Sequence, residues 1–88
     1  MAINYSNKAK AKEDEVTMEI LEECGTVSEN GKNRTLLRFI SWNGNEPKYD
    51  LRTWYEDKNG NEKCGRGIAL TGEELVELYN IIGKLMED

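Results

Sequence analysis

Hydrophobic and polar positions alternate along much of the chain with the two-residue period of a β-strand. Val16, Met18 and Ile20 are separated by polar residues, which predicts a strand with one buried face. Leu21 breaks the alternation, so a bulge or the end of the strand is expected there. Residues 25–31 begin and end with Gly and contain polar turn formers, which predicts a loop.

Two Asn-Gly pairs divide the middle of the chain into three further strands. Asn43-Gly44 is typical of a tight hairpin turn, because both central residues of a type I′ turn need positive φ. Asn59-Gly60 predicts a second tight turn. The strands that flank these turns are predicted at residues 34–42, 49–55 and 62–70. The expected sheet is therefore a four-stranded meander.

A C-terminal helix is predicted from Thr71 onward. Thr71 and Glu74 have the spacing of a capping box, and Glu73 places negative charge in the first turn. Apolar residues then recur at helical spacing and form one wide stripe: Leu75, Leu78, Tyr79, Ile82, Leu85 and Met86. Such a stripe is typical of a core or subunit contact. The predicted fold class is α+β, with four strands followed by one helix.

Size and composition indicate one small domain. The chain has 88 residues, of which 38% are hydrophobic and 33% charged. A chain this short buries only about 60% of the surface of its unfolded form, so a second copy is expected to supplement the core. Residues 1–14 are charged without apolar periodicity and are predicted as a flexible tail, with a single domain at 15–88. A cytoplasmic location without membrane association is expected, since no leader-like or bilayer-length apolar run is present.

The chemistry of metal sites and catalysis is poorly represented. The sequence contains no His, and its two cysteines, Cys24 and Cys64, are far apart without a CxxC spacing. We therefore expect reduced thiols, no metal and no cofactor. Without a His base or a nucleophile motif, an enzyme is not expected either.

Charge is distributed unevenly along the chain. The net charge is −5, yet residues 32–66 hold eight cations and five acids, including all four arginines. Asp50 and Asp57 lie beside Arg52 and Lys58 and are interpreted as ion-pair partners of these cations. Over distances of about a Debye length, a local basic face of this kind can attract a polyanion despite distant acids.

Aromatic residues accompany these cations. Stacking of unpaired bases on Trp42, Trp54 or Tyr55 would contribute about 1–3 kcal/mol per base. Trp54 shares the polar face of Arg52, which favours exposure, whereas Trp42 is equally compatible with packing at the hairpin tip and with stacking. Tyr49 alternates with Leu51 and is predicted in the core.

Four segments, taken in order, resemble one known family. They are Gly-Lys-Asn-Arg at 31–34, Ser-Trp-Asn-Gly at 41–44, Lys-Tyr-Asp-Leu-Arg-Thr-Trp at 48–54, and Lys-Cys-Gly-Arg-Gly-Ile-Ala-Leu-Thr at 63–71 before the helix. Over about residues 16–82 the chain resembles the transcriptional positive coactivator (PC4-like) family, small dimeric binders of single-stranded DNA, and specifically its bacterial YdbC-like branch. The resemblance implies a curved antiparallel sheet, a C-terminal helix, a homodimer through helices and sheet edges, and two basic channels for single strands.

The resemblance and the basic block together define the candidate residues. The nucleic-acid-binding set is Lys32, Arg34, Arg38, Trp42, Lys48, Arg52, Trp54, Tyr55, Lys63 and Arg66. The dimer set is Leu75, Leu78, Tyr79, Ile82 and Leu85. The chain departs from the eukaryotic pattern in a longer first hairpin loop, in the order Trp-Tyr at 54–55, and in a basic loop with one basic residue fewer before its second glycine. It also lacks the serine-rich regulatory tail of the eukaryotic members, so a coactivator role is not carried over.

The leading hypothesis is a sequence-tolerant single-stranded DNA-binding homodimer that supports transcription regulation, replication or repair. Two alternatives remain open. A protein–protein interaction module would use the acidic charge and the helix stripe, with a purely structural sheet. Single-stranded RNA is the other alternative, because stacking does not separate RNA from DNA unless the 2′-OH is read.

Overall fold

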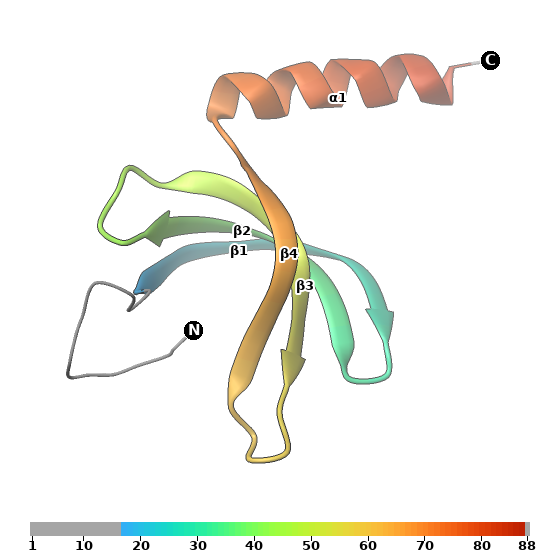
Figure 1. Ribbon diagram of the computed structural model, residues 1–88. Coiled ribbons are helices and arrows are strands. Elements are labelled where there is room, and N and C mark those ends of the chain that lie inside the picture. Colours follow the sequence, from blue (N-terminus) through green and yellow to red (C-terminus); the bar gives the residue numbers. More distant parts are fainter. Residues whose placement is uncertain (1–16, 88) are drawn as a thin grey trace.

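Four antiparallel strands and one helix follow each other in chain order (Figure 1). The computed structural model describes residues 17–87, so the tail predicted at 1–14 lies outside the described residues. The strands are β1 (Met18–Asn30), β2 (Asn33–Trp42), β3 (Lys48–Glu56) and β4 (Glu62–Leu70), and the helix is α1 (Gly72–Met86). The sheet order is β1-β2-β3-β4, which confirms the predicted α+β meander.

β1 is longer than the sequence pattern predicts. The loop expected at 25–31 is wrong for all but its final glycine, because β1 continues to Asn30. The register of β1 against β2 shifts three times, leaving Leu21, Cys24 and Val27 without a direct partner. Each bulge inserts one extra residue and reverses the alternation, so pairing continues while the two-residue period is lost. The bulge expected at Leu21 is confirmed.

The two Asn-Gly turns form as predicted, by different means. Asn43 and Gly44 both have positive φ, 53° and 75°. In the second turn, one carboxylate oxygen of Asp57 accepts hydrogen bonds from the backbone N–H groups of Asn59 and Asn61, each at 2.9 Å. These bonds, the one from Asn61 foremost, stabilise the carboxylate and lower the pKa of Asp57 from its ordinary value of 3.8.

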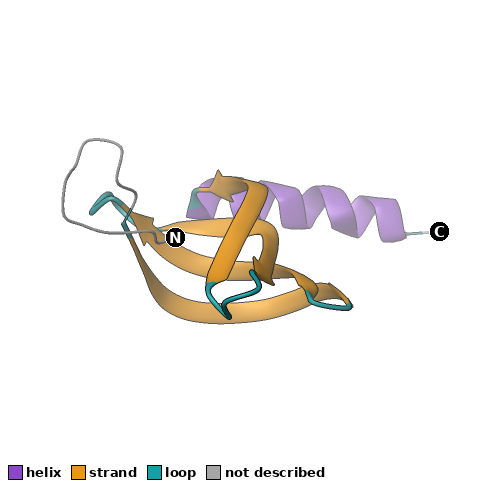
Figure 2. Ribbon diagram, turned by 60° about the horizontal axis from the view of Figure 1, so that its bottom comes forward, coloured by secondary structure: helices purple, strands orange, loops and turns teal. Residues whose placement is uncertain are grey.

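The sheet is strongly twisted (Figure 2), and the hydrophobic core lies on one of its faces. Leu36, Ile40 and Trp54 are buried and in mutual contact. Met18, Ile20, Trp42 and Cys64 are partly buried against this cluster. Because side chains alternate along a strand, Leu37 and Leu51 lie on the opposite face, which is the face that α1 overlies.

α1 begins with the predicted capping box. The Thr71 hydroxyl accepts from the backbone N–H of Glu74 at 3.1 Å, and the Glu74 carboxylate accepts from the backbone N–H of Thr71 at 2.9 Å. The helix contacts β3 and β4, and its C-terminal end projects beyond the strands in both views (Figures 1 and 2). None of the residues of α1 is fully buried.

Among the described residues, no helix has both the length and the apolar character needed to cross a bilayer.

Candidate nucleic-acid interface

The register of β2 against β3 places most of the predicted binding residues on one face of the sheet. Arg34 pairs with Trp54, Leu36 with Arg52, and Arg38 with Asp50. We call this surface the arginine face; its predicted members are Arg34, Arg38, Trp42, Lys48, Arg52 and Trp54. It is the same face that carries the hydrophobic core, and this coincidence decides which members reach solvent.

Trp54 is buried completely, with 0% of its surface exposed. The prediction that it is exposed is wrong, because the curved sheet closes over the face that Trp54 shares with Arg52. Its indole packs against Leu36 and Ile40, and the guanidinium carbon of Arg38 lies 4.5 Å from its ring centroid. Trp54 is therefore a core residue in this fold, out of reach of a base.

Arg38 is also withdrawn from the surface, with 5% exposure. Its Nε donates to Glu23 at 2.8 Å, and its Nη2 lies 3.6 Å from a carboxylate oxygen of Glu62. The prediction that Arg38 contacts nucleic acid does not hold for this geometry, since its guanidinium is paired with acids and packed on an indole. Glu23 and Glu62 supply the neutralisation that a buried charge needs.

Arg34 lies at the more open end of the arginine face. Its Nη2 donates to Glu62 at 2.8 Å, and both side chains keep about a third of their surface exposed. A small polar pocket of about 200 Å³ adjoins it and is lined by Gly31, Lys32, Arg34 and Glu56. Glu62 occupies the position on Arg34 that a phosphate oxygen would take, so binding there means exchanging one anion for another.

Trp42, Asp50 and Arg52 form a closed group of three side chains. Arg52 Nε donates to Asp50 Oδ1 at 2.6 Å, and Arg52 Nη2 donates to Asp50 Oδ2 at 2.9 Å. The indole Nε1–H of Trp42 donates to Asp50 Oδ2 at 3.1 Å. The guanidinium carbon of Arg52 lies 4.9 Å from the centroid of the Trp42 ring, within cation–π distance. The interpretation of Asp50 as an ion-pair partner of Arg52 is confirmed.

The remaining predicted residues lie in a turn, in a bulge and on the opposite face of the sheet. Lys32 is exposed in the turn between β1 and β2. Arg66 is exposed in β4, where a bulge interrupts the pairing with β3 between Arg52 and Trp54. Tyr55, 38% exposed, pairs with the half-buried Lys63 on the opposite face of the sheet. The ten predicted residues therefore do not lie together on one face of the sheet. The three arginines of the face each have an acidic partner.

Gly67 explains how closely β4 approaches β3 beside Arg52. A Cβ atom at this position would lie 2.1 Å from Arg52 Cβ and 2.3 Å from the carbonyl oxygen of Leu51. Only glycine allows this approach, so Gly67 fixes the distance between β4 and the strand that carries Arg52.

The chain matches a known protein family by sequence. Residues 28–81, from the end of β1 through most of α1, match the family described as Transcriptional Coactivator p15 (PC4). The chain belongs to this PC4 family. A similar protein, with the name "Uncharacterized protein", occurs in Treponema pallidum (strain Nichols). It is 38% identical over 76 residues, which cover 85% of this chain and 86% of the relative. The PC4 family consists of non-enzymatic DNA-binding proteins and transcription cofactors.

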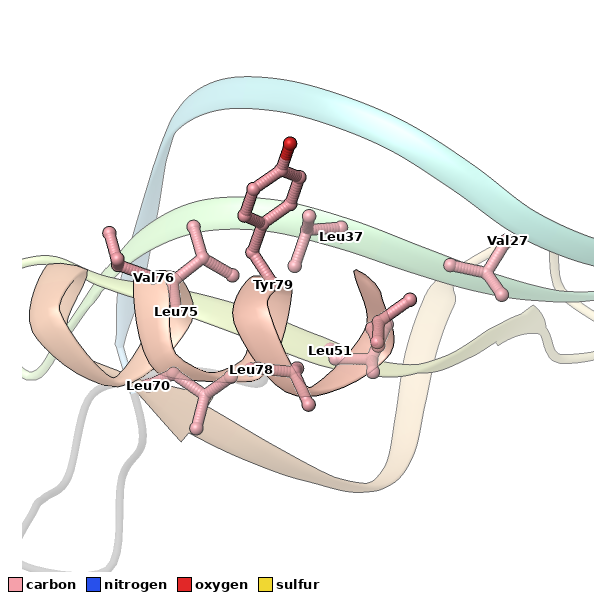
Figure 3. A pocket seen from close by; sticks show the side chains of 9 residues that line it. Val27, Leu37, Leu51, Leu70, Leu75, Val76, Leu78 and Tyr79 are labelled. Atoms are coloured by element: carbon pink, nitrogen blue, oxygen red, sulfur yellow. The ribbon is translucent and has the colours of Figure 1, made fainter. Parts of the chain in front are cut away.

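The PC4 domain of this chain leaves a large apolar surface beside α1. An apolar groove of about 520 Å³ lies between the helix and the sheet (Figure 3). Val27, Leu37, Leu51 and Leu70 line it from the strands. Of the predicted dimer residues, Leu75 and Leu78 are half-buried toward this groove, whereas Tyr79, Ile82 and Leu85 are 74%, 45% and 76% exposed.

Within residues 17–87 of the PC4 domain, no three His, Cys, Asp or Glu side chains lie close enough together to hold a metal ion. Cys24 and Cys64 are both free thiols. Burial raises the pKa of the Cys24 thiol above its ordinary value of 9.0, and the carboxylates of Glu22 and Glu23 raise it further.

Sequence reasoning identified Asp50 as an ion-pair partner but missed its place at the centre of the site, and it missed Glu62 entirely. The Asp-x-Arg spacing at 50–52 does put both side chains on one face of a strand, so this pair was detectable. The contact of Glu62 with Arg34 joins residues 28 positions apart. It depends on β4 folding back over β3, for which local pattern carries no signal.

Proposed function

We propose that this protein is a sequence-tolerant single-stranded DNA-binding homodimer that supports transcription regulation, replication or repair. The observation that carries the proposal is the extent of the PC4 family match, which spans every member of the arginine face together with most of α1. We further propose that it acts in the cytoplasm of a bacterium, as a YdbC-like member of the family. The occurrence of the relative in Treponema pallidum supports the bacterial origin alone.

Within this proposal, the two accessible rings of the predicted binding set stack bases and the exposed cations of that set hold phosphates. Trp42 is half-buried and Tyr55 is 38% exposed, which leaves ring surface for stacking. Lys32, Lys48 and Arg66 are exposed and would contact the phosphate backbone. The acidic total charge then opposes binding at long range, so affinity should depend strongly on salt and on contacts made at close range.

A second copy of the chain is the proposed occupant of the apolar surface on α1. Val76 and Ile81 widen the exposed stripe, with 59% and 54% of their surfaces in solvent, and Met86 of the stripe itself is 78% exposed. Together with the groove beside α1, the stripe forms a large contiguous apolar patch, which is typical of an interface rather than of a free surface. A two-fold arrangement would pair this patch with itself.

A titration with labelled oligo-dT tests the nucleic-acid part. Anisotropy measured at three salt concentrations should show affinity falling linearly on a log–log plot, with weaker binding to a matched duplex. Affinity that ignores salt, or equal binding of duplex, would contradict the proposal. Competition with an oligo-U of the same length decides between DNA and RNA, since only a site that reads the 2′-OH favours RNA.

Light scattering tests the dimer part. The wild-type chain should have twice the monomer mass at micromolar concentration, and Leu85→Glu should shift it toward monomer by placing a charge in the apolar stripe. Asn80→Glu is the matched control, because it adds the same charge on the opposite side of α1. A monomeric wild type that binds another protein through α1 would instead favour an interaction module.

A further inference from the structure

Asp50 is the most deeply buried charged residue of the arginine face. It is 0% exposed, and both of its carboxylate oxygens accept hydrogen bonds. Removing a carboxylate from water is costly unless a cation and donors replace the lost solvent. Arg52 supplies the cation through two parallel N–H bonds, and Trp42 supplies a further donor. The three side chains therefore depend on one another for their positions.

This arrangement restricts the Trp42 indole. A tryptophan at the end of a strand, beside a five-residue hairpin loop, would otherwise have several rotamers open to it. Its Nε1–H donates a hydrogen bond to Asp50, and its ring lies against the Arg52 guanidinium. The indole also packs against the core cluster, yet it remains half-buried rather than sealed like Trp54. Trp42 is thus the ring of the arginine face that is both fixed and accessible.

The N–H donors of Arg52 are engaged by the same group of side chains. Its Nε and Nη2 donate to Asp50, and its Nη1 lies 3.4 Å from the carbonyl oxygen of Gly65. The side chain is only 18% exposed. A phosphate ligand needs a guanidinium edge that is open to solvent, whereas Arg52 directs its donors into the protein. The geometry assigns Arg52 to holding the ring.

We propose, on the basis of the single-strand binding proposed above, that Asp50 is a positioning residue. It locks the Arg52 guanidinium and the Trp42 indole into one preorganised platform on which a nucleic-acid base stacks. Arg52 acts through Trp42 and not as a phosphate ligand. A fixed ring lowers the ordering cost that a mobile aromatic side chain would add to each binding event.

A double-mutant cycle in the full chain tests this role. Asp50→Asn, Trp42→Phe and the double variant are compared with wild type for oligo-dT affinity at three salt concentrations. Asp50→Asn should weaken binding by about tenfold, the magnitude of one stacked base, and leave the salt slope unchanged. Trp42→Phe should weaken it similarly, and the double variant should be little worse than either single one, since both act through the same ring.

Electrostatics alone predicts the opposite result. Removing a carboxylate near a polyanion site should strengthen binding, so a fall in affinity for Asp50→Asn requires a positional cause. Glu46→Gln is the matched control, because it removes the same charge from the exposed hairpin loop. It should leave affinity unchanged or raise it slightly.

Tryptophan fluorescence reports on the Trp42 ring in the absence of nucleic acid. In a Trp54→Phe background, Trp42 is the only tryptophan. Asp50→Asn should then shift its emission to the red and increase its quenching by acrylamide. If Asp50→Asn does not fold, Arg52→Lys replaces it, because lysine keeps the charge but loses the bidentate contact. Arg52→Lys should lower affinity with an unchanged salt slope.

The outcomes separate this proposal from the proposed function. The positioning role alone would be overturned if the wild type binds oligo-dT and the losses of affinity in Asp50→Asn and Trp42→Phe multiply in the double variant. Arg52→Lys with wild-type affinity, which is the result expected of a phosphate contact, would overturn it too. Wild type that fails to bind any single strand would overturn both.

Discussion

Replacing the two tryptophans one at a time separates stability from binding. Trp54 is 0% exposed in the core, and Trp54→Ala should cost about 3–5 kcal/mol of unfolding free energy through lost burial and the cavity left behind. A chain of 88 residues has about 4–13 kcal/mol in total, so this variant lies near the threshold of folding. Trp42→Ala removes a half-buried ring and one hydrogen bond, for which about 1–2 kcal/mol is expected.

Urea unfolding followed by circular dichroism at one fixed protein concentration measures the difference. With a slope of about 2 kcal/mol/M, Trp54→Ala should lower the midpoint by about 2 M and Trp42→Ala by less than about 1 M. Oligo-dT affinity should follow the reverse order among folded variants: Trp42→Ala loses about five- to hundredfold, whereas the milder Trp54→Phe stays near wild type. A Trp54→Phe variant that folds but binds worse than Trp42→Ala would refute the assignment of the rings.

Three further predictions concern the surroundings of the site. Glu62→Gln should raise oligo-dT affinity about two- to fivefold in the same anisotropy assay, because Arg34 loses the half-exposed anion that competes with phosphate; unchanged affinity would contradict this exchange. Gly67→Ala should destabilise the fold by about 1–3 kcal/mol or more in urea, since its Cβ would overlap Arg52 Cβ and backbone; a wild-type midpoint would argue against the close approach. The pKa of Asp57 is lowered in the folded chain, so its contribution is present above about pH 3.8 and lost as pH falls through the folded pKa. Urea midpoints at about pH 5 and about pH 3 should therefore differ more for wild type than for Asp57→Asn, and equal differences would contradict the turn geometry.

Local pattern was sufficient for most of the secondary structure. Three local signals were followed by the expected element: strand alternation by β2 to β4, the Asn-Gly pairs by turns, and the Thr71–Glu74 spacing by a capping box. Each of these signals depends on residues close in sequence. β1 is the exception. Its bulges shift the alternation three times, and their positions depend on pairing with β2 rather than on the residues of β1 itself.

The sequence by itself determined which residues of one strand share a face: the two-residue period puts Arg52 and Trp54 together. The register of β2 against β3 then joined Arg34, Arg38 and Trp42 to that face. Only the tertiary structure decided which of them meet solvent. Curvature closes the sheet over Trp54 and Arg38 and leaves Trp42 half-buried. Ion pairs between distant strands, such as Arg34 with Glu62, likewise exist only after β4 has folded back. Alternation is a property of one strand, whereas burial and pairing are properties of the closed sheet, and that is why the shared face within a strand was predictable and its solvent exposure was not.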